Sequence, residues 1–298
     1  MAQSFPPDVI VLDDEKLLHA RMARGKKGPR IVAAESYRLA ANTFSPAVVS
    51  PQLTNESSLS EAVRRMRIET GRWDRASVLL PDSWFRINIL DIAALPEGAK
   101  EAEEMVRWTL KRTMPLDPAL LRVRYEVLTR TATSARVLAL TAIDQTLVAI
   151  ENVLNEGGID VVVIEPIGVN IWNAIAMREP ASARDRIFFY VREGEFTTAV
   201  FRGAQPLFIR TRNLNSNRSL EQEIKLSASY LRDTVRTESV EQCYISGTAN
   251  GEISSIISEQ FGAPVRKITL ADMTDEAWPD NAGDYESELA AATGVFTS

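Results

Sequence analysis

The sequence contains only one cysteine and one histidine in 298 residues. Cys243 cannot form an internal disulfide, which fits a reducing cytoplasm. His19 lies in the strand-like segment 17–21, where we expect an ordinary strand residue. With so few of these side chains, neither a metal cluster nor a Cys-His or Ser-His catalytic dyad is expected.

Long apolar runs are also missing. No segment approaches the ~20 apolar residues that a membrane-spanning helix requires. Residues 1–7 have neither the basic nor the apolar region of a signal peptide, so we expect a cytoplasmic protein. The formal net charge is −6, which argues against nucleic-acid binding. At 298 residues the chain is long enough for one large or two medium lobes.

The sequence is organised as two similar halves. Residues 9–39 and 187–212 each predict a three-strand β-meander, because short apolar or alternating runs are separated by turns. Each meander is followed by a helix, a strand, a second helix and a further strand. The predicted helices span residues 59–70, 100–113, 144–156, 218–232, 252–261 and 286–294. The predicted later strands span residues 77–81, 84–92, 121–129, 135–142, 160–164, 242–247 and 265–269.

This pattern predicts an α/β protein with a duplicated core. We expect the first lobe (subdomain 1A) to comprise residues 1–83 and 159–180, and the second lobe (2A) to comprise residues 181–298. Residues 84–158 then form an inserted subdomain. The uniform apolar run at 160–164 is typical of a strand buried in a parallel sheet.

Several motifs, in their order and spacing, resemble the type IV pilus assembly protein family PilM. They are Leu79-Leu80-Pro81-Asp82-Ser83, the segment from Trp108 to Leu116, Tyr125-Glu126-Val127-Leu128, Glu165-Pro166 and Ser246-Gly247. The resemblance runs from about residue 10 to residue 294. It implies an actin-like (ribonuclease H-like) core with an inserted 1C-type subdomain, as in FtsA and the cytoplasmic domain of GspL. It also implies a protein that lies beneath the inner membrane and binds the N-terminal tail of the bitopic protein PilN. The resemblance further implies that any bound ATP has a structural or regulatory role.

The nucleotide-binding turns depart from that family. Asp13 is retained, but Glu15 stands where the first turn needs a glycine, and a side chain there blocks close backbone approach to phosphate. A carboxylate adds repulsion of about 1 kcal/mol at ~4 Å in water. In the second turn Gly194 and Thr197 are retained, but Arg192 replaces the aspartate that anchors Mg²⁺. An arginine at this position either binds phosphate directly or is a solvated residue of the hairpin turn, and the sequence leaves both open.

Two further departures lie in the part of the site that would bind the adenosine of ATP. Ser246-Gly247 is followed by Thr248 instead of a second glycine. After the second meander, relatives insert a subdomain, called 2B, which forms a wall of the adenine cleft. Here residues 213–217 lead directly into the helix predicted at 218–232, which leaves no room for it. We therefore predict no 2B subdomain and a degenerate nucleotide site. We expect no cofactor, and binding of Mg-ATP is the alternative that the sequence leaves open.

The leading hypothesis is a non-catalytic scaffold of a pilus or type II-like secretion platform that binds a PilN-like tail. Other pilus platform proteins are further candidate partners. The resemblance implies a partner groove between 1A and 1C, for which we select Leu80, Trp84, Phe85 and Ile87. For Trp108, a place in the core of the inserted subdomain is favoured over contact with a partner. One alternative is an active ATPase or kinase, with Asp13 holding Mg²⁺ and Asp160 or Glu165 as base. Another is an FtsA-like filament protein.

Overall fold

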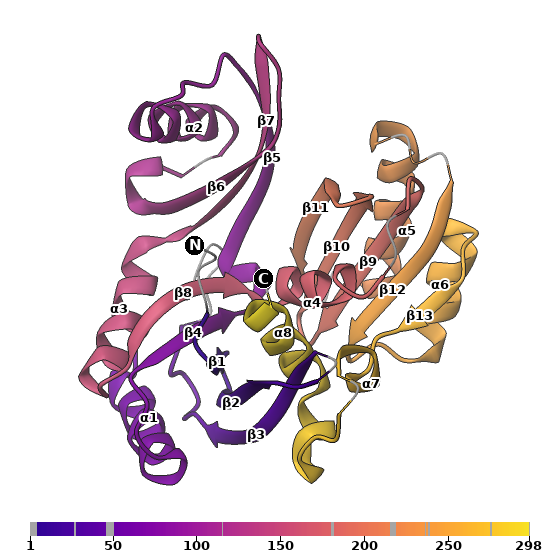
Figure 1. The fold of residues 1–298 in the computed structure, drawn as a ribbon. Coiled ribbons are helices and arrows are strands. Elements are labelled where there is room, and N and C mark those ends of the chain that lie inside the picture. Colours follow the sequence, from indigo (N-terminus) through magenta and orange to yellow (C-terminus); the bar gives the residue numbers. More distant parts are fainter. Residues whose placement is uncertain are drawn as a thin grey trace.

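The computed structural model describes residues 5–26, 28–45, 51–114, 116–179, 182–214, 219–235, 237, 239–274 and 276–297. Its strands form three β-sheets, and two helices lie between the two larger sheets (Figure 1). Within the described ranges, no helix combines the length and apolar character needed to cross a bilayer.

The first sheet has the strand order β3-β2-β1-β4-β8. Its members are β1 (Asp8–Leu12), β2 (Lys16–Arg24), β3 (Pro29–Arg38), β4 (Arg75–Leu80) and β8 (Asp160–Pro166). The first three form the predicted antiparallel meander, and β1, β4 and β8 run parallel to one another. The apolar side chains of β1 are divided between two cores, one on each face of the sheet, which explains its uninterrupted apolar sequence.

The second sheet repeats this plan, with the order β11-β10-β9-β12-β13. Its members are β9 (Asp185–Arg192), β10 (Glu195–Arg202), β11 (Gln205–Asn213), β12 (Val240–Gly247) and β13 (Val265–Lys267). Again three antiparallel strands are followed by two parallel ones. The strand order and directions of the two halves are therefore the same, as the repeated sequence pattern predicts.

Each large sheet has one face covered by helices of its own half. These helices are α1 (Glu56–Thr70) and α3 (Asp144–Glu156) on the first sheet, and α5 (Leu220–Tyr230) and α6 (Gly251–Phe261) on the second. Asn55 caps α1, because its side chain accepts a hydrogen bond from the Ser58 N–H. The shorter elements are η1 (Asp82–Trp84), η2 (Pro118–Leu120), the π-helical turn η3 (Leu231–Val235), α7 (Leu270–Met273) and η4 (Asp280–Tyr285).

The two inner faces are covered by α4 (Ile167–Ala176) and α8 (Glu286–Thr297), which lie between the sheets in Figure 1. The rings of Trp172 on α4 and Phe201 on β10 stack with centroids 3.8 Å apart, so α4 packs on the second sheet. Helix α8 packs on the strands of the first sheet. The two helices also pack on each other, and one continuous core joins the halves. The sequence pattern did not predict α4, and α8 extends three residues beyond the helix predicted at 286–294.

The third sheet, β5-β7-β6, and α2 (Ala99–Thr113) form the unit at the top of Figure 1. The strands are β5 (Phe85–Ala93), β6 (Leu121–Arg130) and β7 (Ser134–Ile143). One face of this sheet packs against α2 around Leu90, Val106 and Val137. On the opposite face, Ile87 and Leu138 are only partly buried.

Trp108 does not fill a core: it is 57% exposed, and the Arg112 guanidinium lies over its ring. Only residues 214–219 separate β11 from α5. Of the connection and helix start predicted there, residues 215–218 lie outside the described part of the chain.

Candidate functional site

The turn between β1 and β2 and the turn between β9 and β10 meet where the two halves face each other. In the first turn, Asp13 Oδ1 accepts hydrogen bonds from the Glu15 and Lys16 N–H groups, both at 2.8 Å. These amides therefore bind the turn's own carboxylate. Burial raises the pKa of Asp13, while Arg192 and the two amides act in the opposite direction.

Arg192, in the second turn, bridges the two halves. Its Nη2 lies 3.4 Å from Asp13 Oδ2 and 3.2 Å from Asp14 Oδ1, and its side chain is 20% exposed. Burial disfavours the guanidinium cation, but the carboxylates of Glu195, Asp13 and Asp14 around it raise its pKa. The guanidinium is thus a protein cation held between the two turns.

Two cavities adjoin this bridge, and both are lined by Asp14, Glu15, Arg192 and Glu193. Their volumes are about 670 Å³ and 490 Å³. The smaller cavity has two cationic side chains, Lys16 and Arg192, and Lys16 Nζ is already paired with Glu288 Oε1 at 2.6 Å. Its carboxylates are more numerous: Asp13, Asp14, Glu15, Glu193, Asp284, Glu286 and Glu288. This excess of negative charge disfavours an anionic ligand.

The remaining residues selected from the sequence are only partly brought together. Gly247 lines the smaller cavity with φ +97°, and a Cβ there would come within 1.8 Å of the Val191 carbonyl oxygen. Gly194, with φ +70°, lines the larger cavity. Ser246 is buried against Ser287 of α8, with 3.2 Å between the hydroxyl oxygens. Thr197 bonds to Thr211 of β11 and lies away from both cavities.

A buried pair of carboxyl groups, Asp82 and Glu195, was not found from the sequence. Glu195 begins β10 and accepts hydrogen bonds from the Asp82 and Ser83 N–H groups at 3.2 and 3.0 Å. Asp82 Oδ1 accepts the Gly168 N–H at the start of α4, at 2.7 Å. A Cβ on Gly168 would lie 2.2 Å from Asp82 Oδ2, so a larger residue there would force the Asp82 carboxyl group to move.

Asp82 and Glu195 are both almost fully buried, at 0% and 2% exposure. Burial, and then the neighbouring Glu195 carboxylate, raise the pKa of Asp82 to about 7. Burial also raises the pKa of Glu195, against the effect of its hydrogen bonds and of Arg192. The pair links the first half to the second, and burial raises the pKa of both carboxyl groups.

The two acids selected for the enzyme alternative lie at opposite ends of β8. The Asp160 side chain is 73% exposed and lies near Arg75, so it is remote from the cavities. Glu165 is partly buried at the other end and accepts a hydrogen bond from Asn170 Nδ2 at 2.9 Å. Across the residues that the structure describes, no three His, Cys, Asp or Glu side chains are arranged to hold a metal ion.

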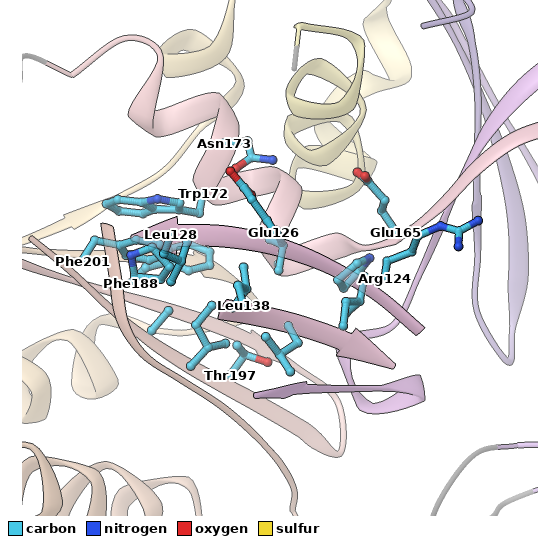
Figure 2. A pocket seen from close by; sticks show the side chains of 18 of the residues that line it. Arg124, Glu126, Leu128, Leu138, Glu165, Trp172, Asn173, Phe188, Thr197 and Phe201 are labelled. Atoms are coloured by element: carbon cyan, nitrogen blue, oxygen red, sulfur yellow. The ribbon is translucent and has the colours of Figure 1, made fainter. Parts of the chain in front are cut away.

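A separate groove of about 330 Å³ lies between the uncovered face of the third sheet, α4 and the second sheet. Its apolar lining includes Ile87, Leu128, Leu138, Leu140, Trp172, Phe188, Phe201 and Ile209. In Figure 2 the rings of Trp172, Phe188 and Phe201 gather at one end of the view, and Glu165 and Arg124 lie at the other.

Of the four residues selected for a partner groove, only Ile87 lines this one. Leu80, Trp84 and Phe85 are 0–6% exposed and belong to the core of the first half. Trp84 packs against Phe44 with ring centroids 4.8 Å apart. These three side chains support the fold. Tyr125, Glu126 and Leu128 of β6 line the groove and belong to a motif of the family resemblance, whereas the groove residues on β7, α4 and β10 had no distinctive sequence signal.

The chain is similar to known proteins in structure, but no sequence comparison gives a match. No family model and no curated sequence matches the chain. Over 99% of this chain and 98% of the other, it is similar to a structure described as a PilM-PilN type IV pilus biogenesis complex, with a TM-score of 0.80 at 16% identity. A Bacteroides thetaiotaomicron protein with an actin-like ATPase fold and unknown function matches with a TM-score of 0.57 at 9% identity, covering 96% and 95% of the two chains.

A third similar structure is the cytoplasmic domain of EpsL, an inner-membrane component of the type II secretion system of Vibrio cholerae. It matches with a TM-score of 0.52 at 13% identity, over 98% of this chain and 94% of that one. These likenesses confirm the predicted fold class: the chain has an actin-like α/β fold.

Proposed function

We propose that this protein is a non-catalytic scaffold of a type IV pilus or type II-like secretion platform, which binds the N-terminal tail of a PilN-like inner-membrane protein. The observation that carries the proposal is the likeness to the PilM-PilN structure over nearly the full length of both chains. The likeness to the EpsL cytoplasmic domain supports the same kind of assembly. On this proposal the protein is cytoplasmic and is held at the inner membrane by its partner.

The nucleotide site of this scaffold is degenerate. The Arg192 guanidinium pairs with Asp13 and Asp14 in the gap between the two turns, where an actin-like protein would need room for phosphates and Mg²⁺. The Glu15 and Lys16 amides are bound by Asp13, and Glu15 itself adds a carboxylate to the cavity wall. The residues present therefore fit Mg-ATP poorly, which supports a pseudo-ATPase.

The tail binds in the apolar groove between the third sheet and α4. Extended segments bind such grooves through apolar side chains placed in pockets, and free strand edges add main-chain hydrogen bonds. The outer edge of β6 is unpaired among the described strands, and its residues Arg124 to Glu126 line the groove. Ile87 and Leu138 supply apolar contacts from the neighbouring strands.

The test is fluorescence anisotropy with labelled peptides that carry the N-terminal tails of the bitopic membrane proteins encoded beside this chain. We expect saturable binding to one of them and its loss in Leu138→Asp, which places a charge in the groove. The matched control is Val148→Asp, because Val148 is 38% exposed on α3 and outside the groove. No binding by any tail, or equal loss in both variants, would contradict the proposal.

Calorimetric titration with Mg-ATP tests the nucleotide site separately. We expect no heat of binding at millimolar nucleotide. Binding at micromolar affinity would overturn the degenerate site and favour an active ATPase.

A further inference from the structure

Glu165 is the anomalous residue of the apolar groove. It occupies the penultimate position of β8 and is partly buried among lining residues that are mostly apolar. Burial raises the pKa of its carboxyl group, and the hydrogen bond from Asn170 offsets this in part. An ionised carboxylate in such surroundings loses hydration, and this loss needs a compensating partner.

The protein supplies only part of that compensation. Asn170 is fully buried, and its Nδ2 donates to Glu165 Oε2 and to the Pro166 carbonyl oxygen, so the carboxylate is held in one orientation. Among the described residues, no Lys, Arg or His nitrogen lies within 4.0 Å of Glu165, and Oε1 makes no hydrogen bond. Arg124 lines the same groove, but its guanidinium donates to the Val123 carbonyl oxygen.

We propose that Glu165 selects for a cationic group on the segment that binds the groove, either a free α-amino group or a Lys or Arg side chain. The proposal rests on the proposed function, since it assumes that a peptide segment docks there. The chemistry is complementary: the aromatic and aliphatic residues of the groove take apolar side chains, while Glu165 Oε1 accepts a charge-assisted hydrogen bond. Such bonds are about twice as strong as neutral ones.

The probe is a phage-displayed library of random twelve-residue peptides selected on the full chain. Groove binders are defined as peptides that lose binding to Leu138→Asp and keep it with Val148→Asp. We expect these peptides to share a Lys, an Arg or a free N-terminus at a fixed distance from two apolar residues. A synthetic peptide of this set should bind Glu165→Gln at least 10-fold more weakly, because glutamine keeps the shape and the Asn170 contact but not the charge.

Glu104→Gln is the matched control, since Glu104 is an exposed carboxylate on α2, outside the groove, and should change affinity little. Replacing the peptide's Lys by norleucine, or acetylating its N-terminus, identifies which cation is bound, and the neutral peptide should no longer distinguish wild type from Glu165→Gln. Groove binders without a shared cation, or equal affinity for Glu165→Gln, would overturn the inference and leave groove binding intact. A library that yields no groove binders would overturn docking in the groove itself.

Discussion

Gly294 of α8 lies directly against the backbone of Asn170 of α4, so closely that a Cβ on Gly294 would come 1.9 Å from the Asn170 carbonyl oxygen. This contact lies within the core that joins the two halves, and residues 290–292 of α8 are all buried alanines. Two helices can cross this closely only where the residue that faces the other helix's backbone has no side chain, as Gly294 does here. The junction between the halves therefore depends on small residues of α8.

Replacing Gly294 by alanine should destabilise the protein by about 1–3 kcal/mol or more, because the added methyl group meets backbone, which cannot move aside as a flexible side chain can. The measurement is urea unfolding followed by circular dichroism. Gly283→Ala is the matched control, since no atom lies within 4 Å of a Cβ at that position. Equal stability of the two variants would mean that α4 and α8 do not pack as described.

The ion pair between Arg192 and Asp13 should contribute to the stability of the junction. Arg192→Met leaves Asp13 buried without its cation, and we expect a loss of about 1–3 kcal/mol, less than for a fully buried pair because the Arg192 side chain is 20% exposed. A double-mutant cycle with Asp13→Asn should give a coupling energy of about 1 kcal/mol or more. The cycle with Asp14→Asn should give less than about 0.5 kcal/mol, because the Asp14 side chain is 61% exposed. Coupling that is equal in both cycles would contradict this assignment.

The sequence was sufficient to predict both large sheets, because their strands are short apolar or alternating runs bounded by turns. It was insufficient for α4: Ile167, Ile171, Trp172 and Ile175 are buried, but so are Gly168, Asn170 and Ala174, and a helix buried on most sides has no polar face to reveal its period. The pairing of Glu195 with Asp82 joins residues that are 113 positions apart, which no local pattern can indicate. The boundaries of the inserted subdomain at residues 84–158 stay a prediction.

Replacement by alanine should be much more destabilising at Trp84 than at Trp108. Trp84 is 6% exposed in the core, so Trp84→Ala should cost about 3–5 kcal/mol through the cavity it leaves. Trp108 contacts Arg112 on an exposed helix face, so Trp108→Ala should change stability by less than about 1 kcal/mol. Guanidinium unfolding curves measure both. A large cost for Trp108→Ala would show that its ring is covered in solution.

The buried pair of Asp82 and Glu195 should make stability depend on pH. The pKa of Asp82 is about 7 in the folded protein against an ordinary value of 3.8, and that of Glu195 is raised as well. Between these values the folded state retains a proton that the unfolded state has released. The free energy of unfolding should therefore fall as pH rises from about 4 to about 7, and the contribution of Asp82 should be constant outside that window.

Asp82→Asn removes a titrating group while its side-chain oxygen can still accept the Gly168 N–H. The free energy of unfolding of this variant minus that of wild type should increase by more than about 1 kcal/mol from pH 5 to pH 8. The reason is that one pKa unit corresponds to about 1.4 kcal/mol and only wild type loses this contribution. The measurement is urea unfolding at a series of pH values, with the exposed Asp160→Asn as the matched control. Because Asp82 and Glu195 interact, the transition belongs to the pair, and Glu195→Gln should shift it as well. A wild-type pH profile in Asp82→Asn would mean that the pair is fully ionised in the folded protein.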